Sequence, residues 1–131
     1  MTTDKNNERE LVICVLNEPD YLHAVLTAMV EAGVPTSTVI ESQGMGRILS
    51  QEVPIFAGFR NLFEGSKPFN HTIFAVVDNN KMTREVTALI QEVLSEVEES
   101  SKGVIFSLPV SFFARLALPE SGTKENAKEK K

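Results

Sequence analysis

The fold is decided by the stretch GVIFSLPV at residues 103–110, taken together with TVIESQGMGR at residues 38–47. Each contains a run of apolar and β-branched residues of strand length, and each adjoins glycine, which tolerates backbone angles that other residues avoid. The second stretch leads into Gly44, Gly46 and Arg47, where we expect a sharp backbone turn that can approach a ligand closely. The arginine adds a fork of five N–H donors suited to phosphate or carboxylate. Gly-x-Gly-Arg alone is a weak motif, and its place among the other elements gives it meaning.

Length and composition favour one soluble, cytoplasmic domain. The chain has 131 residues, of which 42% are hydrophobic, and a formal net charge of −5, which argues against non-specific binding to nucleic acid. Its single cysteine, Cys14, cannot form an internal disulfide, so a reducing compartment is expected. No apolar run approaches the roughly 18 residues that span a bilayer, so we expect no membrane insertion.

The chain alternates between strand and helix patterns. Four segments have strand character, namely residues 11–16, 36–42, 72–77 and 104–108. Two segments carry an apolar stripe at helical spacing: Leu22, Val25, Leu26, Met29 and Val30, then Val86, Leu89, Ile90, Val93, Leu94 and Val97. Asn17 is a candidate N-cap for the first helix, and Gly33 marks its end.

This order, β-α-β-loop-β-α-β, is that of a ferredoxin-like α+β fold. It predicts a four-stranded antiparallel sheet with two helices on one face and a long loop between the second and third strands. Residues 11–118 form this domain, whereas residues 1–10 and the charged tail at 119–131 are expected to be disordered. Because the strands are apolar on both faces, the face without helices should be buried by oligomerisation.

The element order, the Gly44-Met45-Gly46-Arg47 segment and the strand at 103–110 together resemble the PII signal-transduction family of nitrogen regulators. The resemblance implies a homotrimer with its sheets facing inward and adenine-nucleotide sites in the clefts between subunits. It also implies that the long loop is a T-loop that binds target proteins. The ligand residues that it implies are Gly44, Gly46, Arg47, Lys102, Gly103 and Arg115.

The chain departs from the family pattern at several positions. Ile48 stands where the family has a glutamine that helps to bind magnesium and 2-oxoglutarate. The loop before the last strand, EESSKG at 98–103, carries two acids that would repel a triphosphate. Ala117 replaces a second phosphate-binding arginine, and the only tyrosine, Tyr21, lies outside the T-loop.

Several side chains keep a second interpretation. Arg47 is either a phosphate ligand or a solvated loop arginine, and Arg115 serves either an anion site or a salt bridge between subunits. Lys102 fits a surface lysine at least as well as a ligand. Cys14 is expected to be an inert core thiol. The two histidines and the cysteine do not have the spacing of a metal site.

The long loop contains its own helical pattern. Residues 54–65 begin with a proline, end with a glycine, and place apolar residues at helical spacing between them. We expect a short amphipathic helix whose partner-binding residues are Phe56, Phe59, Arg60 and Phe63. Its apolar face packs either on its own trimer or in a groove of the partner.

The function that follows is regulatory rather than enzymatic. We expect a trimer that requires no cofactor, binds ATP, ADP or AMP as effector, and controls a transporter or a metabolic enzyme. The alternative is a ligand-independent interaction or scaffold protein, because the phosphate loop is altered. An enzyme on the same fold is unsupported, since the sequence offers no nucleophile–base pair.

Overall fold

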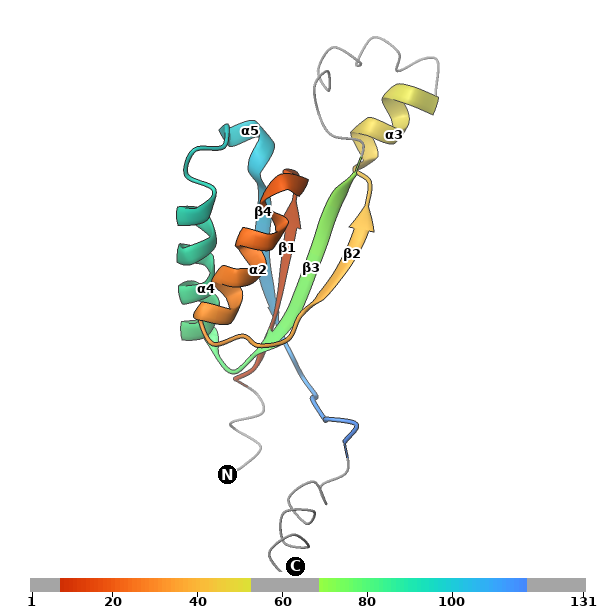
Figure 1. The fold of residues 1–131 in the computed structure, drawn as a ribbon. Coiled ribbons are helices and arrows are strands. Elements are labelled where there is room, and N and C mark those ends of the chain that lie inside the picture. The colour runs from red at the N-terminus through yellow and green to blue at the C-terminus, as the bar shows by residue number, and fades with distance from the viewer. Residues whose placement is uncertain (1–7, 53–68, 118–131) are drawn as a thin grey trace, which may run out of the picture.

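The computed structural model describes residues 8–52 and 69–117. Its sheet has four strands in the order β2-β3-β1-β4, and all neighbouring pairs are antiparallel (Figure 1). The strands are β1 (Glu10–Leu16), β2 (Thr38–Ser42), β3 (Asn70–Val77) and β4 (Gly103–Pro109). This topology confirms the predicted ferredoxin-like fold.

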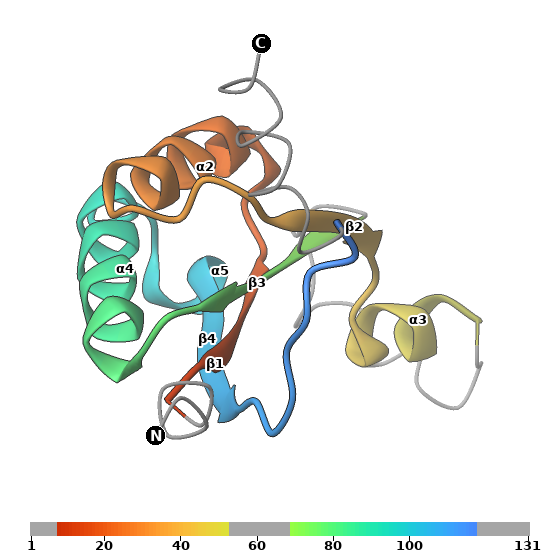
Figure 2. The same ribbon diagram turned by 90° about the horizontal axis from the view of Figure 1, so that it is seen from below.

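Two helices cover one face of the sheet (Figure 2). A short 3₁₀ turn, η1 (Pro19–Tyr21), leads into α2 (Leu22–Glu31), which packs beside α4 (Asn80–Val93). Alternate strand residues point toward these helices and form the core with their apolar stripes. The largest fully buried side chains are Leu16, Met29, Ile73, Val12, Val25 and Val86.

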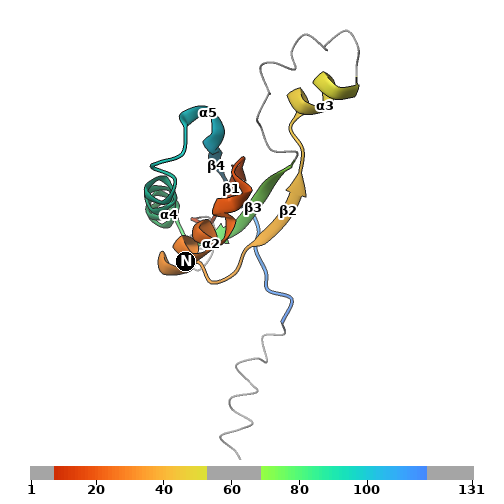
Figure 3. The same ribbon diagram turned by 45° about the horizontal axis from the view of Figure 1, so that its top comes forward.

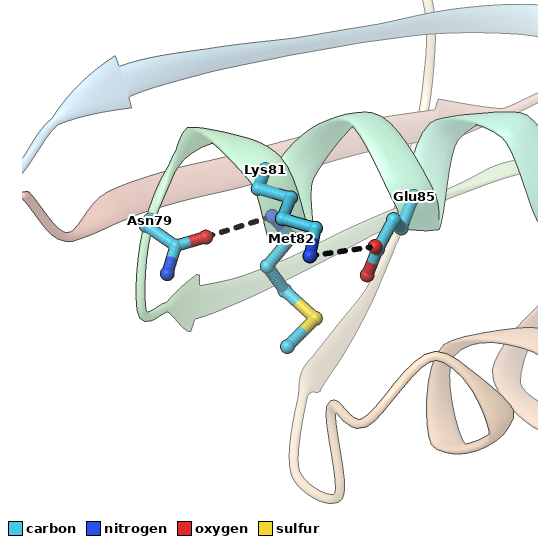
Figure 4. A network of polar contacts seen from close by, with 4 residues as sticks. All are labelled: Asn79, Lys81, Met82 and Glu85. Carbon is cyan, nitrogen blue, oxygen red and sulfur yellow. Dashed lines mark hydrogen bonds and ion pairs between the residues drawn. The ribbon is translucent and has the colours of Figure 1, made fainter.

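The start of α4 is fixed by side chains that its sequence supplies. The Asn79 side-chain oxygen accepts a hydrogen bond from the Met82 backbone N–H at 2.9 Å, and Lys81 lies 4.0 Å from Glu85 one turn on (Figure 4). The Glu10 carboxylate at the start of β1 accepts a hydrogen bond from the Thr83 hydroxyl at 2.7 Å. That bond is the main reason why the pKa of Glu10 is lowered.

The beginning of α2 differs from the prediction. Asn17 does not cap a helix, because η1 intervenes and α2 begins only at Leu22, without a side-chain cap. The Asn17 side-chain oxygen instead accepts a hydrogen bond from the side-chain amide of Asn70 in β3. The end of α2 is as predicted, since Gly33 follows the helix with a φ of 102°.

The opposite face of the sheet is apolar and is not covered by α2 or α4. The register places Ile13 between Phe74 and Phe106 on this face. Its outer strand is open, with Val104 60% and Phe106 47% exposed. The prediction that the sheet is apolar on both faces is therefore confirmed for these strands.

An unpredicted helix, α3 (Met45–Glu52), follows β2 and extends beyond the end of the sheet, away from α2 and α4 (Figures 1 and 3). The sequence predicts a loop over this stretch, because its glycines indicate a turn. The helix predicted at 54–65 lies outside the described residues. No described helix is long and apolar enough to cross a membrane.

The last elements are short. A single helical turn, α5 (Glu99–Lys102), precedes β4. After β4, residues 110–117 form no regular element; they continue past the end of the sheet (Figure 1) and cross toward the β2 side (Figure 2).

Candidate functional site

The first group of predicted ligand residues lies where β2 leads into α3 (Figure 3). Gly44 separates the strand from the helix, and Gly46 and the half-buried Arg47 fall in the first turn of α3. Neither glycine has a positive φ, since Gly33 and Gly103 are the only described residues that do. The sharp turn expected here is therefore the start of a helix, and its backbone conformation does not itself demand glycine.

A series of hydrogen bonds connects the end of β2, next to this group, with the neighbouring strand ends. The Ser42 hydroxyl donates to the Asn70 side-chain oxygen at 2.5 Å, and the Asn70 amide donates to the Asn17 side-chain oxygen at 3.2 Å. The Asn17 backbone N–H in turn donates to the Lys102 carbonyl at 3.2 Å. A Cβ on Gly44 would lie 4.0 Å from the Asn70 amide nitrogen. Asn17 and Asn70 thus connect the end of β2 with the turn that precedes β4.

The second group, Lys102 and Gly103, lies at the start of β4. Gly103 has a φ of 116°, and a Cβ there would lie 1.9 Å from the Val15 carbonyl oxygen, so no other residue fits. The Lys102 ammonium lies 2.8 Å from Glu99, and this bond lowers the pKa of the Glu99 carboxyl. The Lys102 ammonium, predicted as a phosphate ligand, is therefore paired with the exposed carboxylate of Glu99.

These two groups stand at opposite edges of the sheet. β2 and β4 are its outermost strands, so three strand spacings, or roughly 14 Å, separate their backbones. Any ligand that touches both groups in one subunit must cross the ends of β3 and β1, where Asn70 and Asn17 lie.

The third predicted position, Arg115, lies at the other end of the sheet. Its guanidinium is 5.4 Å from the centre of the Phe113 ring, and the Arg9 guanidinium is 4.5 Å from the same centre. Both arginines line a cavity of about 560 Å³ beside the start of β2 and the end of β3. The other lining residues include Thr36, Thr38, Phe74, Val76, Met82 and Asp78.

One chain therefore holds the six predicted ligand residues in three separate groups, of three, two and one residues. Arg115 is separated from the others by the length of the strands. The predicted partner-binding residues Phe56, Phe59, Arg60 and Phe63 lie outside the described residues.

Sequence reasoning missed three residues of these sites. The sequence predicts a helix cap at Asn17, a loop that includes Asn70, and an N-terminal lead-in that includes Arg9. The available signal was only that each is a polar residue at a strand end, because their contacts depend on strand register.

The buried cysteine and the metal-ligating residue types are the other groups for which the sequence makes a prediction. Burial raises the pKa of the Cys14 thiol to about 11, as an inert core thiol requires. Within residues 8–52 and 69–117, no cluster of histidine, cysteine and carboxylate side chains could hold a metal ion.

These features define the class of protein. It is a ferredoxin-like domain with a long connection between β2 and β3, and with glycine-containing segments at one end of the sheet. A family model, nitrogen regulatory protein P-II, matches residues 10–118. The chain belongs to this family, whose members are regulatory signalling proteins.

Solved structures share the fold. PII of Arabidopsis thaliana, bound to citrate, is 21% identical with a TM-score of 0.61, and the match covers 84% of each chain. The ATP complex of GlnK from B. subtilis is 19% identical with a TM-score of 0.53, over 80% of this chain and 84% of the other. No curated protein sequence matches this one.

Proposed function

We propose that this chain is a homotrimeric P-II regulator that binds an adenine nucleotide between subunits and controls a partner protein through its T-loop. The main observation in support is that the predicted ligand residues of one chain lie at two opposite ends of its sheet. Arg47 and Lys102 lie at one end of the sheet, and Arg115 lies at the other. In a closed ring the edge of one subunit meets the edge of the next, so residues that are distant within a chain can approach across the cleft.

The uncovered face of the sheet supports the trimer. Val104, Phe106 and Leu108 expose between 46% and 60% of their surface on it. Burying such a face contributes about 25 cal/mol per Å² and strongly favours association. Light scattering at micromolar concentration should give the mass of three chains, and a monomeric mass would refute the trimer.

Nucleotide binding is tested by calorimetry with ATP, ADP and AMP on the full-length chain. We expect saturable binding of at least one of them, with lower affinity than in relatives that keep the full glycine-rich phosphate loop. Two features support the lower affinity, namely the Lys102–Glu99 ion pair and the replacement of one family arginine by Ala117.

The same ion pair favours the second candidate, a ligand-independent interaction protein on this fold. In that case the trimer would form and the partner would bind, but none of the three nucleotides would produce heat or change partner affinity. Calorimetry therefore separates the two functions.

We assign partner binding to the segment that follows α3, with Phe56, Phe59, Arg60 and Phe63 as contact residues. The proposed partner is a transporter or a metabolic enzyme, and the proposed location is the cytoplasm. Replacing the three phenylalanines by serine should abolish partner binding, destabilise the trimer, or both. Unchanged partner affinity together with unchanged thermal stability would refute this assignment.

A further inference from the structure

One side chain, that of Asn70, lies where several segments of the candidate site meet. Asn70 is the first residue of β3, and the register pairs it with Ser42, the last residue of β2. Because α3 follows β2, Asn70 lies beside the base of that helix (Figure 1). The turn that precedes β4 is at the same end of the sheet, and β4 is two strands away from β3.

The Asn70 side chain uses both of its polar groups. Its oxygen accepts a hydrogen bond from the Ser42 hydroxyl at 2.5 Å, and its nitrogen donates to the Asn17 side-chain oxygen at 3.2 Å. The Ser42 hydroxyl has one proton, which it gives to Asn70, so in its 2.8 Å contact with the Thr72 hydroxyl it accepts. These four side chains are half-buried, where hydrogen bonds are stronger than in open water.

The backbone extends this series to both predicted ligand segments. The Asn17 N–H donates to the Lys102 carbonyl at 3.2 Å, which ties Asn17 to the turn before β4. On the other side, the Asn70 amide nitrogen is the nearest atom to a Cβ built on Gly44, at 4.0 Å. The Gly44 carbonyl accepts a hydrogen bond from the Ile48 N–H at 3.2 Å, in the first turn of α3. Asn70 therefore connects the start of α3 with the start of β4.

We propose that Asn70 is a positioning residue, which holds the segment from Gly44 to Arg47 and the turn at Lys102 and Gly103 in one fixed arrangement. The two segments adjoin the outermost strands, β2 and β4, which do not pair with each other. Only an amide of this size supplies the acceptor for Ser42 together with a donor toward β1. A ligand that contacts segments already held in place loses less free energy to ordering them. The use of this arrangement by a nucleotide rests on the proposed function, whereas the arrangement itself does not.

The first test is hydrogen exchange on the full-length chain without nucleotide, comparing the natural chain with Asn70→Ala. The amides to follow are those of Asn17 and Ile48, because neither is bonded to Asn70 itself. Both should exchange about twofold to tenfold faster in the variant, the change that corresponds to one lost hydrogen bond. Asn80→Ala is the matched control, because Asn80 makes side-chain hydrogen bonds to Glu10 and Arg84 at the other end of the sheet. It should leave both rates unchanged.

Faster exchange at these two amides, with unchanged exchange at the centre of β1 and β3, would support the positioning role. Unchanged rates at both amides would overturn it. An equal rise throughout the sheet would show only a general loss of stability and would also overturn it. Asn17→Ala cuts the same connection from the other side and keeps the bond between Ser42 and Asn70, so it serves if Asn70→Ala does not fold. The Ile48 amide should then still exchange faster.

The second test is calorimetry with ATP on Asn17→Ala, Asn70→Ala and the double variant. If the two amides act as one unit, each single variant should weaken ATP binding by about twofold to tenfold, and the double variant should be no weaker than the weaker single one. Additive losses would mean that each amide contacts the nucleotide separately, and unchanged affinity would mean that ATP does not use the arrangement. Either result would overturn the role of Asn70 in binding. If the natural chain does not bind ATP, the proposed function fails, and hydrogen exchange still decides whether Asn70 holds the two segments.

Discussion

The two glycine-containing segments of the site look alike in sequence and differ in structure. At Gly103 the backbone has a φ of 116° and a ψ of −157°, and a side chain would collide with the Val15 carbonyl. At Gly44 φ is not positive, and the nearest atom to an added Cβ is 4.0 Å away. The fold therefore requires glycine at position 103 but not at position 44.

This difference indicates where ligand contact should be sought. A glycine that the fold requires says nothing about a ligand. A Cβ on Gly44 would make only an ordinary van der Waals contact with the Asn70 amide at the base of α3, so the fold does not explain the glycine there. The segment from Gly44 to Arg47 is therefore the stronger candidate for direct contact with a phosphate.

The largest expected effect follows from substituting alanine at each glycine. Gly103→Ala should lower the free energy of unfolding by at least about 3 kcal/mol, because it combines a backbone region almost restricted to glycine with a severe clash. Gly44→Ala should change it by less than about 1 kcal/mol. Urea denaturation of both variants measures the contrast, and equal losses would mean that the comparison is wrong.

The next effect concerns the charge beside Gly44. Arg47→Ala should weaken ATP binding by about 1.5–3 kcal/mol, the usual range for a hydrogen bond to a charged group. Lys81→Ala removes an equivalent charge from the exposed face of α4 and serves as the control. Unchanged ATP affinity in Arg47→Ala, measured by calorimetry, would move the phosphate site away from α3.

The fold could be predicted from sequence because its signals are local and periodic. The apolar stripe of α4 and the strand pattern of β1 each specify their own element, and the order of elements then leaves few topologies. The helix α3 was missed because its glycines, read alone, suggested a turn. Gly46 is tolerated in the first helical turn, where the backbone is less constrained by helical hydrogen bonds than in the interior.

The site was predicted only in part, for a different reason. Arg47, Lys102 and Arg115 could be chosen by residue type and position, but their neighbours depend on strand register. The contact between Asn17 and Asn70 joins residues 53 apart in the sequence. Arg9 and Phe113 meet only because the two ends of the domain pair beside each other. No local pattern encodes such contacts.

A smaller effect on ATP affinity is expected beside Gly103, where Glu99 pairs with Lys102. Glu99→Gln removes the carboxylate that lies 2.8 Å from Lys102 and leaves a neutral side chain of the same size. ATP affinity should rise a few-fold at most, because Glu99 is exposed and solvent screens its charge. Glu96→Gln, an exposed change nearby without this contact, is the control. If ATP affinity falls instead, the contact of Glu99 with Lys102 holds the turn before β4 in the conformation that binds ATP, and does not compete with ATP for Lys102.

The last prediction is that the chain does not respond to 2-oxoglutarate, because of Ile48. This residue follows Arg47 in the first turn of α3. An isoleucine side chain has no atom that could bind a metal ion or donate to a carboxylate. Titration of the natural chain with 2-oxoglutarate in the presence of ATP and magnesium should therefore give no saturable heat, and adding EDTA should not alter the ATP isotherm. Ile48→Gln restores a polar side chain and tests whether this position alone is responsible. Tight, magnesium-dependent uptake of 2-oxoglutarate by the natural chain would show that other groups replace the glutamine. The segment from Gly44 to Arg47 would then be a more complete ligand site than its residues indicate.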